Sequence, residues 1–519
     1  MNGAESLIRT VSRAGVDVCF ANPGTTEMHL VQALDEVRAI RPVLGLFEGV
    51  CTAAADGYAR IAERPAMTLL HLGPGMANGI ANLHNAHRGR TPLLSVVGEH
   101  ATFHRRRGAP LQTDIEGLAR PVSKWVRTSA NAGAVARDAA EALAAAGSAP
   151  AGVATLIVPA DCAWSDAAGP AEPVPPTPPA RVADAAVEAA AAALAAVRPP
   201  TLLLGGTALT EAGLRAAAGV AAATGCRLLS ETFPRRMERG GDLPVVPRLA
   251  YFPEEATAEL AQGGGIVLAG AAEPIAFFGY PELPSELAPP GMAVDTLAEP
   301  AHDAADALER LADRLGAATE APAPRPPGPD ADDAAPPDSA PLGPLSAVRI
   351  IAALQPEGAI VVDEGLTLSA AYVPASAGAP RHAYLALTGG AIGFGLPAAA
   401  GAAIAAPDRP VIALQADGSG MYTAQALWTH AREGLDVTTL ICANRSYRIL
   451  LDELRRAGVE QPRPGAQSMT SLGEPPLDWV ALATGMGVPA AQATTAGELT
   501  AELRRALAEP GPHLVEMVL

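Results

Sequence analysis

The chain has 519 residues, of which 49% are hydrophobic and 18% are charged, and its formal net charge at pH 7 is −18. This length exceeds what one hydrophobic core supports and predicts two to four globular domains, while the hydrophobic content excludes a disordered protein. The acidic balance argues against nucleic acid and anionic membrane surfaces as partners, and no apolar run is long enough to span a membrane.

The cysteines and the N-terminal segment indicate a cellular location. The first residues lack a basic region followed by an apolar core, so the sequence predicts no signal peptide. The five cysteines are dispersed without CxxC spacing, as expected for reduced thiols. They are Cys19, Cys51, Cys162, Cys226 and Cys442. We therefore expect a cytoplasmic protein.

Three blocks follow one another along the chain, and each alternates strand-like with helix-like segments. Residues 1–170 form the first block, residues 180–318 the second and residues 345–519 the third. Residues 319–344 are dense in Pro, Ala and Asp and predict an exposed linker. The alternation predicts an α/β fold with three doubly wound domains, each a parallel sheet covered by helices.

Polar residues follow three apolar segments of the first block. The candidates are Thr25 after residues 17–21, Glu48 after residues 42–47 and His71 after residues 66–70. Taken singly, Glu48 is a carboxylate at a strand end, and most such residues are solvated, while His71 fits a satisfied core histidine near a strand end.

A glycine-rich turn marks the third block. Residues 388–397 read Thr-Gly-Gly-Ala-Ile-Gly-Phe-Gly-Leu-Pro and include Gly390 and Ile392. Upstream of it, residues 361–364 form a strand that leads to Thr367. By itself the glycine-rich segment is a turn between a strand and a helix, with Ile392 in the core.

A strand–helix–strand unit carries the strongest local signal. Residues 411–414 are a buried-type strand that leads to Asp417-Gly418-Ser419, and residues 437–442 are a second that leads to Asn444-Arg445-Ser446. Both polar groups therefore lie at one edge of a parallel sheet. Mg²⁺ prefers six oxygen ligands, and Asp417, Asn444 and the Ser446 carbonyl can supply three of them beside diphosphate oxygens and water. The N–H groups of Gly418 and Ser419 suit phosphate.

This pair resembles the thiamine diphosphate fingerprint of the acetolactate synthase, pyruvate decarboxylase and benzoylformate decarboxylase superfamily. Ala416 and Ala443 stand where the fingerprint has its first Gly and its first Asn. The segment around Glu48, with the small-residue helix 54–60, resembles the superfamily's glutamate that activates the cofactor's pyrimidine. The resemblance covers nearly the whole chain and implies pyrimidine-binding, middle and diphosphate-binding domains.

The resemblance implies a role for each candidate. Glu48 would hydrogen-bond the pyrimidine, the Gly390 carbonyl would accept from its 4′-amino group, and Ile392 would bend the cofactor. The other expected cofactor contacts are Thr367, Gly418, Ser419 and Tyr447, and the expected Mg²⁺ ligands are Asp417, Asn444 and Ser446. In the superfamily the half of the active site that carries the glutamate and the half that carries the metal meet across a dimer interface. The resemblance therefore implies a homodimer, often a dimer of dimers.

Within the superfamily the chain is locally most similar to benzoylformate decarboxylase. Thr25 corresponds to a serine whose hydroxyl contacts the substrate carboxylate, and His71 to a histidine that handles protons. Residues 276–280, Ala-Phe-Phe-Gly-Tyr, contain no histidine where that enzyme has its second one. His100 and His104 do not reproduce the adjacent histidine pair of pyruvate decarboxylase. Without a second histidine, a long-lived enamine can attack another carbonyl.

We expect a thiamine diphosphate- and Mg²⁺-dependent enzyme that converts a small 2-oxo acid to an aldehyde and carbon dioxide through an enamine. The alternatives are a carboligase like acetolactate synthase, near whose glutamine Gln112 falls, and a cofactor-binding paralogue without catalysis.

Several residues leave two interpretations open. The basic run 105–107 fits an anionic substrate or a solvated loop. Arg235-Arg236 fits a nucleotide phosphate such as that of FAD, but Gly205-Gly206 is too weak a signal to predict FAD. Core packing is the simpler reading for residues that can also shape an apolar pocket, namely Phe277, Phe278, Tyr280 and Leu451.

Overall fold

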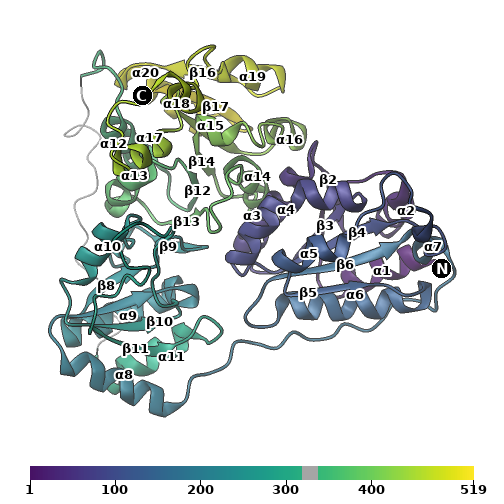
Figure 1. Ribbon diagram of the computed structural model, residues 1–519, viewed down its shortest axis with the longest axis horizontal. Coiled ribbons are helices and arrows are strands. Elements are labelled where there is room, and N and C mark those ends of the chain that lie inside the picture. Colours follow the sequence, from purple (N-terminus) through teal and green to yellow (C-terminus); the bar gives the residue numbers. More distant parts are fainter. Residues whose placement is uncertain (318–336) are drawn as a thin grey trace.

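The computed structural model describes residues 1–317 and 337–519. Within them the chain forms three α/β lobes, each with its own sheet (Figure 1). Most of the linker expected at 319–344 lies outside the described residues. Of its remainder, Pro341 forms a bridge to Thr495, and a helix begins at Pro344. Among the described helices none combines the length and apolarity needed to cross a membrane.

The first sheet has the strand order β2-β1-β3-β4-β6-β5, and all its pairs are parallel. Its strands are β1 (Val18–Asn22), β2 (Arg41–Leu44), β3 (Ala66–Leu70), β4 (Leu93–Glu99), β5 (Trp125–Thr128) and β6 (Val153–Pro159). The helices are α1 (Gly3–Arg13), α2 (Met28–Val37), α3 (Glu48–Ala62), α4 (Leu72–Arg88), α5 (Ile115–Ala119), α6 (Ala132–Gly147) and α7 (Ala160–Trp164). Short 3₁₀ turns are η1 (Thr25–Glu27), η2 (Arg105–Arg107) and η3 (Arg120–Val122). Strands β3, β4 and β6 are buried throughout, as expected for a parallel sheet covered on both faces.

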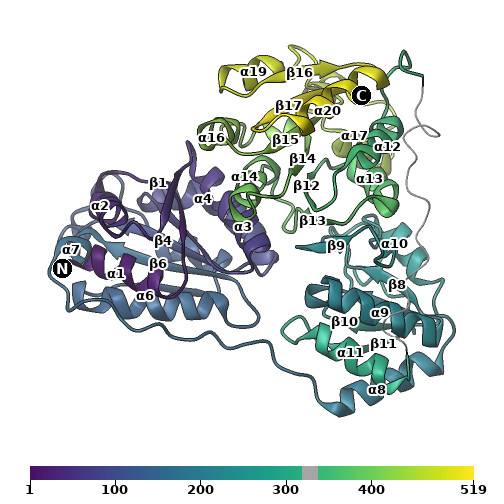
Figure 2. The ribbon, with the colours of Figure 1, turned by 180° about the vertical axis from the view of Figure 1, so that it is seen from behind.

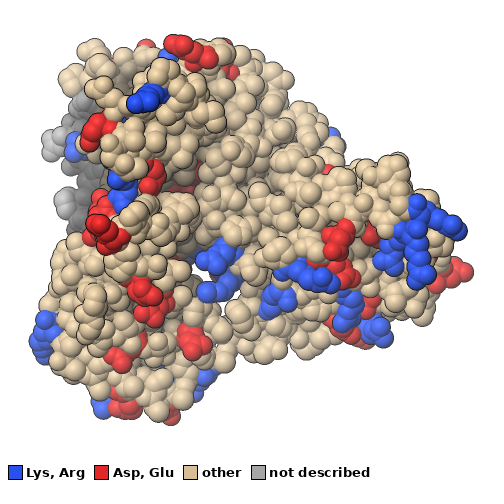
Figure 3. Space-filling view, viewed as in Figure 1, with Lys and Arg blue, Asp and Glu red and all other residues tan. Residues whose placement is uncertain are grey.

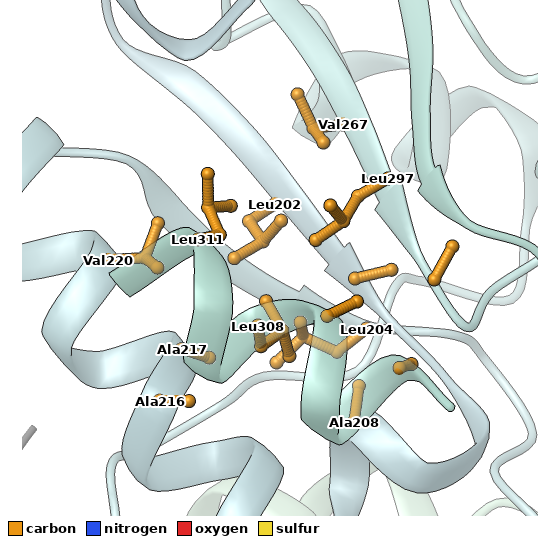
Figure 4. Close-up of a cluster of buried hydrophobic side chains, with 14 of the residues drawn as sticks. Leu202, Leu204, Ala208, Ala216, Ala217, Val220, Val267, Leu297, Leu308 and Leu311 are labelled. Carbon is orange, nitrogen blue, oxygen red and sulfur yellow. The ribbon is translucent and has the colours of Figure 1, made fainter. Parts of the chain in front are cut away.

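The second sheet has the order β11-β10-β7-β8 and is also parallel. It contains β7 (Pro200–Leu204), β8 (Arg227–Ser230), β10 (Gly265–Ala269) and β11 (Ala293–Ala298), with α8 (Asp184–Ala196), α9 (Glu211–Thr224), α10 (Pro253–Leu260), α11 (Ala304–Arg314) and η4 (Gly206–Leu209) around it. Figure 4 shows Leu202 and Leu204 of β7 facing Leu308 and Leu311 of α11, which builds the core of this lobe.

The third sheet has the order β16-β17-β15-β14-β12-β13-β9. Its strands are β12 (Ala359–Glu364), β13 (His382–Ala386), β14 (Val411–Ala416), β15 (Val437–Ala443), β16 (Ala490–Ala493), β17 (His513–Val518) and β9 (Met237–Arg239). Its helices are α12 (Pro344–Leu354), α13 (Ser369–Ala375), α14 (Gly395–Ala405), α15 (Asp417–Gly420), α16 (Ala426–Glu433), α17 (Arg448–Arg456), α18 (Pro464–Thr470), α19 (Trp479–Gly485) and α20 (Ala496–Ala508), with η5 (Ser376–Gly378).

The predicted α/β fold with parallel sheets in three lobes is confirmed, with one local difference. Strand β9 comes from the second block but lies antiparallel to β13 at the edge of the third sheet. The strands that residues 345–519 contribute are all parallel, as expected, and only this added edge strand runs antiparallel. An antiparallel edge strand on an otherwise parallel sheet is a common arrangement.

Helices α3 and α14 join the first and third lobes, and both views of the ribbon place them side by side (Figures 1 and 2). Their backbones approach closely at glycines. A Cβ added to Gly401 would lie 1.8 Å from the Ala54 carbonyl oxygen, and one added to Gly57 would lie 2.1 Å from that of Ala398. Small residues are therefore required where these helices cross.

Candidate active site

A histidine and a buried carboxylate meet at the carboxyl edge of the first sheet. His71 follows β3, and its Nδ1 lies 2.7 Å from Oε2 of Glu27, which ends η1 after β1. The Glu27 side chain is fully buried and also accepts from the Gly24 amide at 2.8 Å and the Thr26 hydroxyl at 2.5 Å. Because the carboxylate accepts a hydrogen bond from Nδ1–H, the neutral imidazole carries its proton on Nδ1 and leaves Nε2 unprotonated.

Thr25 and Thr26 are distinguished by this arrangement. Thr26 uses its hydroxyl to hold Glu27, whereas Thr25 is exposed at the start of η1. Sequence reasoning assigned Thr25 and His71 but gave no role to Glu27, which lies 44 residues from its partner. The available signal was a Glu and a His that each follow a strand of one parallel sheet.

Glu48 is the first residue of α3 and is 8% exposed. Its Oε2 accepts from the Asn78 side chain of α4 at 2.9 Å, and its Oε1 lies against Gly75. In the described residues no hydrogen bond joins this carboxylate to the Asp417 turn. The two expected halves of the site therefore belong to separate hydrogen-bond networks within one chain.

The glycine-rich segment 388–394 connects β13 to α14 and is held by side chains of α4. Asn82 donates to the Gly393 carbonyl at 3.1 Å, and Asn85 donates to the Ala391 carbonyl at 2.7 Å. Within residues 1–317 and 337–519 no hydrogen bond reaches the Gly390 carbonyl, so it is available to a ligand. Ile392 is half-buried beside it.

Gly390 itself is constrained by the second lobe. Its φ is +75°, and an added Cβ would lie 2.6 Å from Cζ of Phe277. The residue must therefore be glycine, both for its left-handed backbone and for the aromatic ring packed on it. The segment 276–280, which lacks a histidine, does reach the glycine-rich loop, and it presents Phe277.

A buried carboxylate joins the glycine-rich loop to the metal loop. Glu364, at the end of β12, is 1% exposed and accepts from the Gly393 and Gly395 amides, each at 2.6 Å. Gln415 donates to the same carboxylate at 3.1 Å and to the Ser419 hydroxyl at 2.6 Å. Burial raises the pKa of Glu364 above its ordinary value. Sequence reasoning placed Glu364 in the strand-end segment 361–367 beside the diphosphate but gave its side chain no role, and it did not assign Gln415, since polar residues inside apolar strands show no partner in the sequence.

Asp417 and Asn444 lie together at the carboxyl edge of the third sheet. The Asp417 carboxylate, 3% exposed, accepts from the Gly418 amide at 2.9 Å and the Arg445 amide at 2.7 Å, while Asn444 Oδ1 accepts from the Ser446 amide at 3.0 Å. Arg445 has a φ of +55°, which bends the chain between Asn444 and Ser446. Burial raises the pKa of Asp417.

The donor set fits Mg²⁺. Asp417 is a buried carboxylate that forms no ion pair with any described residue, and a buried anion is unfavourable without a cation. Its neighbours are oxygen donors, which a hard divalent ion prefers. In the described part of the chain no group of three or more His, Cys, Asp or Glu side chains is placed to hold a metal ion.

The other expected cofactor residues divide into two groups. Gly418 lies under the Tyr447 ring, where an added Cβ would meet Cε1 at 2.6 Å, and Ser419 is fixed by Gln415. Thr367 is exposed on the turn that follows β12. The structure thus gathers Gly418, Ser419 and Tyr447 at the Asp417 turn and leaves Thr367 on the surface.

Arg235 and Arg236 bind their own chain. Arg235 donates to the Arg90 carbonyl at 3.3 Å, and Arg236 forms ion pairs with Glu238 at 2.8 Å and Glu63 at 3.0 Å. Both guanidinium groups are therefore engaged between lobes, and the suggestion that they bind an FAD phosphate is not supported.

Comparison with known proteins identifies the family. Residues 1–118 match the model described as thiamine pyrophosphate enzyme, N-terminal TPP binding domain, and residues 366–517 match the corresponding C-terminal TPP binding domain. The chain is 52% identical to the Mycobacterium tuberculosis protein named "Putative acetolactate synthase large subunit IlvX", across 100% of this chain and 99% of that protein. It is 31% identical to benzoylformate decarboxylase of Pseudomonas aeruginosa, across 97% and 96% of the two chains.

A solved structure shares the fold. The Rhodococcus jostii RHA1 thiamine diphosphate-dependent 4-hydroxybenzoylformate decarboxylase superposes with a TM-score of 0.86 at 24% identity, covering 100% of this chain and 99% of the other. The two family models, the full-length relatives and this fold agree. The chain belongs to the thiamine pyrophosphate enzyme family.

Proposed function

We propose that the protein is a thiamine diphosphate- and Mg²⁺-dependent decarboxylase that converts a small 2-oxo acid to an aldehyde and carbon dioxide. The observation that carries this proposal is the Glu27–His71 pair, because a buried carboxylate at 2.7 Å fixes the histidine that would transfer protons. The likeness to benzoylformate decarboxylase of Pseudomonas aeruginosa supports the reaction class.

The described residues have distinct proposed roles. Asp417, Asn444 and the Ser446 carbonyl would hold Mg²⁺, and the amides of Gly418 and Ser419 would face the diphosphate. When bound, thiamine diphosphate supplies an electron sink for loss of carbon dioxide.

On the substrate side, His71 would hold or release a proton at Nε2, and the exposed Thr25 hydroxyl would contact the substrate carboxylate. Glu48 would hydrogen-bond the pyrimidine of the cofactor, the Gly390 carbonyl would accept from its amino group, and Ile392 would support its bent shape.

A carboligase is the second candidate, and one observation favours it. The second lobe presents Phe277, not a histidine, to Gly390. Slow proton delivery at this position would give a second carbonyl compound time to react. The 52% identity to a protein named as an acetolactate synthase large subunit points the same way.

We also propose a homodimer in which the site forms between subunits, built from domains with the limits 1–170, 180–318 and 345–519. Within one chain, Glu48 and Asp417 belong to separate hydrogen-bond networks. Large apolar side chains near them are exposed, namely Leu46 at 47%, Met421 at 38% and Tyr422 at 54%. Figure 3 shows a broad face over the upper and central part of the molecule with few charged side chains, which suits a second copy of the chain.

Product analysis by NMR tests the proposal. Protein with thiamine diphosphate and Mg²⁺ would receive pyruvate, branched-chain 2-oxo acids and benzoylformate, singly and in pairs. An aldehyde with carbon dioxide supports the decarboxylase, and a 2-hydroxyketone or acetolactate-type acid supports the carboligase. Cofactor binding without turnover would favour the non-catalytic paralogue. Glu48→Gln should abolish turnover, whereas the exposed control Glu36→Gln should not; equal activity of both variants would refute the role of Glu48.

A further inference from the structure

Helix α4 of the first lobe presents polar side chains to the glycine-rich loop of the third lobe. His84 Nε2 lies 3.1 Å from the Gly389 carbonyl oxygen, and the Asn85 side chain contacts Ala391. Because a carbonyl oxygen only accepts hydrogen bonds, the His84 ring donates from Nε2. The partners are 305 and 306 residues apart in the sequence, so a helix of one lobe holds the loop of another.

The side chain of Asn85 binds both polar groups of the Ala391 backbone. Its Nδ2 donates to the Ala391 carbonyl at 2.7 Å, and its Oδ1 accepts from the Ala391 amide at 3.2 Å. Nδ2 also donates to Asn82 Oδ1 at 2.8 Å, and Asn82 donates in turn to the Gly49 and Gly393 carbonyls at 3.0 and 3.1 Å. The orientation of the Asn85 amide is therefore determined, because the flipped amide would set its donor against the Ala391 N–H.

The N–H of Ala391 belongs to the same peptide group as the Gly390 carbonyl. This peptide bond is trans. A trans peptide group is planar, and its N–H and C=O bonds point in opposite directions. With its N–H held by Asn85, the group must direct the Gly390 carbonyl away from α4.

The neighbouring carbonyls of the loop are already occupied. The Gly389 carbonyl is paired with His84 and the Ala391 carbonyl with Asn85, whereas no hydrogen bond from a described residue reaches the Gly390 carbonyl. Gly390 has a φ of +75°, and a residue without a Cβ can adopt many backbone conformations. The direction of its carbonyl therefore depends on the contacts that its neighbours make.

Burial makes this contact between the lobes rigid. Asn82 is 2% exposed and Asn85 is 0% exposed, and each nitrogen and oxygen of the two side-chain amides has a hydrogen-bond partner. The Thr388 hydroxyl adds a hydrogen bond of 2.7 Å to the backbone carbonyl of Asn85. A buried polar network whose members are all paired rigidifies the groups it joins.

We propose that Asn85 is a positioning residue for the cofactor, which it serves by holding the Gly390 carbonyl in one direction. The inference rests on the proposed function, in which that carbonyl accepts from the 4′-amino group of thiamine diphosphate. Asn85 acts through the peptide group between Gly390 and Ala391. Its contribution should therefore be confined to ligands that carry a hydrogen-bond donor at the 4′ position.

Titration calorimetry with two ligands tests this role. Cofactor-free protein with Mg²⁺ receives thiamine diphosphate or oxythiamine diphosphate, in which an oxygen replaces the 4′-amino group. Asn85→Ala should bind thiamine diphosphate about tenfold more weakly, because the carbonyl is no longer held in place, whereas its affinity for the oxygen analogue should stay within about twofold. An equal loss for both ligands, or no loss for either, would overturn the proposal.

Two further variants support this comparison. Asn131 also accepts from a backbone amide, that of Ala134 at 3.1 Å, but at the exposed start of α6, so Asn131→Ala should leave both affinities unchanged. Asn82→Ala removes the Oδ1 that accepts from Asn85 and should reduce the preference for thiamine diphosphate less strongly. It replaces Asn85→Ala if that variant does not fold, and an unchanged preference would then refute the role of Asn85.

Ligand binding separates this inference from the proposed function. If Asn85→Ala loses the preference for thiamine diphosphate, the positioning role holds even when no tested 2-oxo acid is converted. If the protein decarboxylates a 2-oxo acid and Asn85→Ala keeps the full preference, the proposed function stands and this inference fails. The circular dichroism of the bound pyrimidine at saturating cofactor gives a second readout, and identical spectra for the unsubstituted and Asn85→Ala proteins would contradict the role.

Discussion

Replacing Arg60 by Met should destabilise the fold far more than an ordinary ion-pair substitution. Arg60 and Asp56 are one turn apart on α3, and both side chains are fully buried. The guanidinium donates to the two Asp56 oxygens at 2.7 and 2.6 Å, and to the Ala386 carbonyl at 2.7 Å and the Arg235 carbonyl at 3.1 Å. One side chain thus binds all three lobes.

The size of the loss in unfolding free energy follows from the Asp56 carboxylate and the carbonyl groups that the substitution leaves without a partner. Removing one partner of a buried ion pair costs about 3–5 kcal/mol, because the other charge stays buried without compensation. Each carbonyl left without a donor adds about 1–3 kcal/mol where water cannot reach it. The expected loss is therefore about 5 kcal/mol or more, against a total stability of about 5–15 kcal/mol for a typical domain.

The assay is urea unfolding of the cofactor-free protein by circular dichroism, with midpoint and slope both fitted because three lobes need not unfold together. The control is Arg9→Met. Arg9 pairs with Glu5 at the same helical spacing, but the two side chains are 41% and 20% exposed, so we expect a loss below about 1 kcal/mol. Adding Asp56→Asn to Arg60→Met should recover part of the stability, since it removes the uncompensated charge. An Arg60→Met protein as stable as Arg9→Met would refute the reasoning.

Three further substitutions test the site. Glu27→Gln removes the carboxylate that fixes the His71 ring, so turnover of the best 2-oxo acid should fall by about 10²-fold or more, and an unchanged rate would contradict the dyad. Glu364→Ala leaves the Gly393 and Gly395 amides unpaired and should weaken thiamine diphosphate binding about tenfold or more by titration, with Glu364→Gln intermediate; identical affinities would exclude a positioning role. Asp417→Ala should abolish the Mg²⁺ dependence of cofactor binding, and binding that still strengthens with added Mg²⁺ would remove Asp417 from the metal site.

The positions of the candidate residues were predictable because the strands of a parallel sheet end at one edge. Apolar runs locate β1, β3, β14 and β15, and the polar residue after each run must then lie at the edge where ligands bind. That reasoning placed Asp417 and Asn444 without reference to any contact, whereas Thr25 and His71 were identified by their resemblance to benzoylformate decarboxylase. This inference succeeds because a short window of sequence is enough to show an apolar strand and the residue at which it ends.

Partners across long sequence separations were not predictable in this way. Glu27 and His71 are 44 residues apart, and the Arg60 guanidinium reaches a carbonyl 326 residues away. Nothing in the local pattern distinguishes a buried Arg from a solvated one. Strand β9 was missed for a different reason, because three residues are too few to show a strand period, and its pairing with His382–Tyr384 depends on how the second lobe meets the third.

The glycine-rich loop shows why the site depends on the whole assembly of lobes. Its sequence is permissive, since glycine adopts many backbone conformations. Its shape is instead imposed from three directions, by the α4 side chains of the first lobe, the Phe277 ring of the second and the Glu364 carboxylate of the third. Arg60 adds a hydrogen bond of 3.0 Å to Thr388 at the start of the loop. A change that loosens the packing of any one lobe should therefore alter cofactor binding without touching a residue that contacts the cofactor.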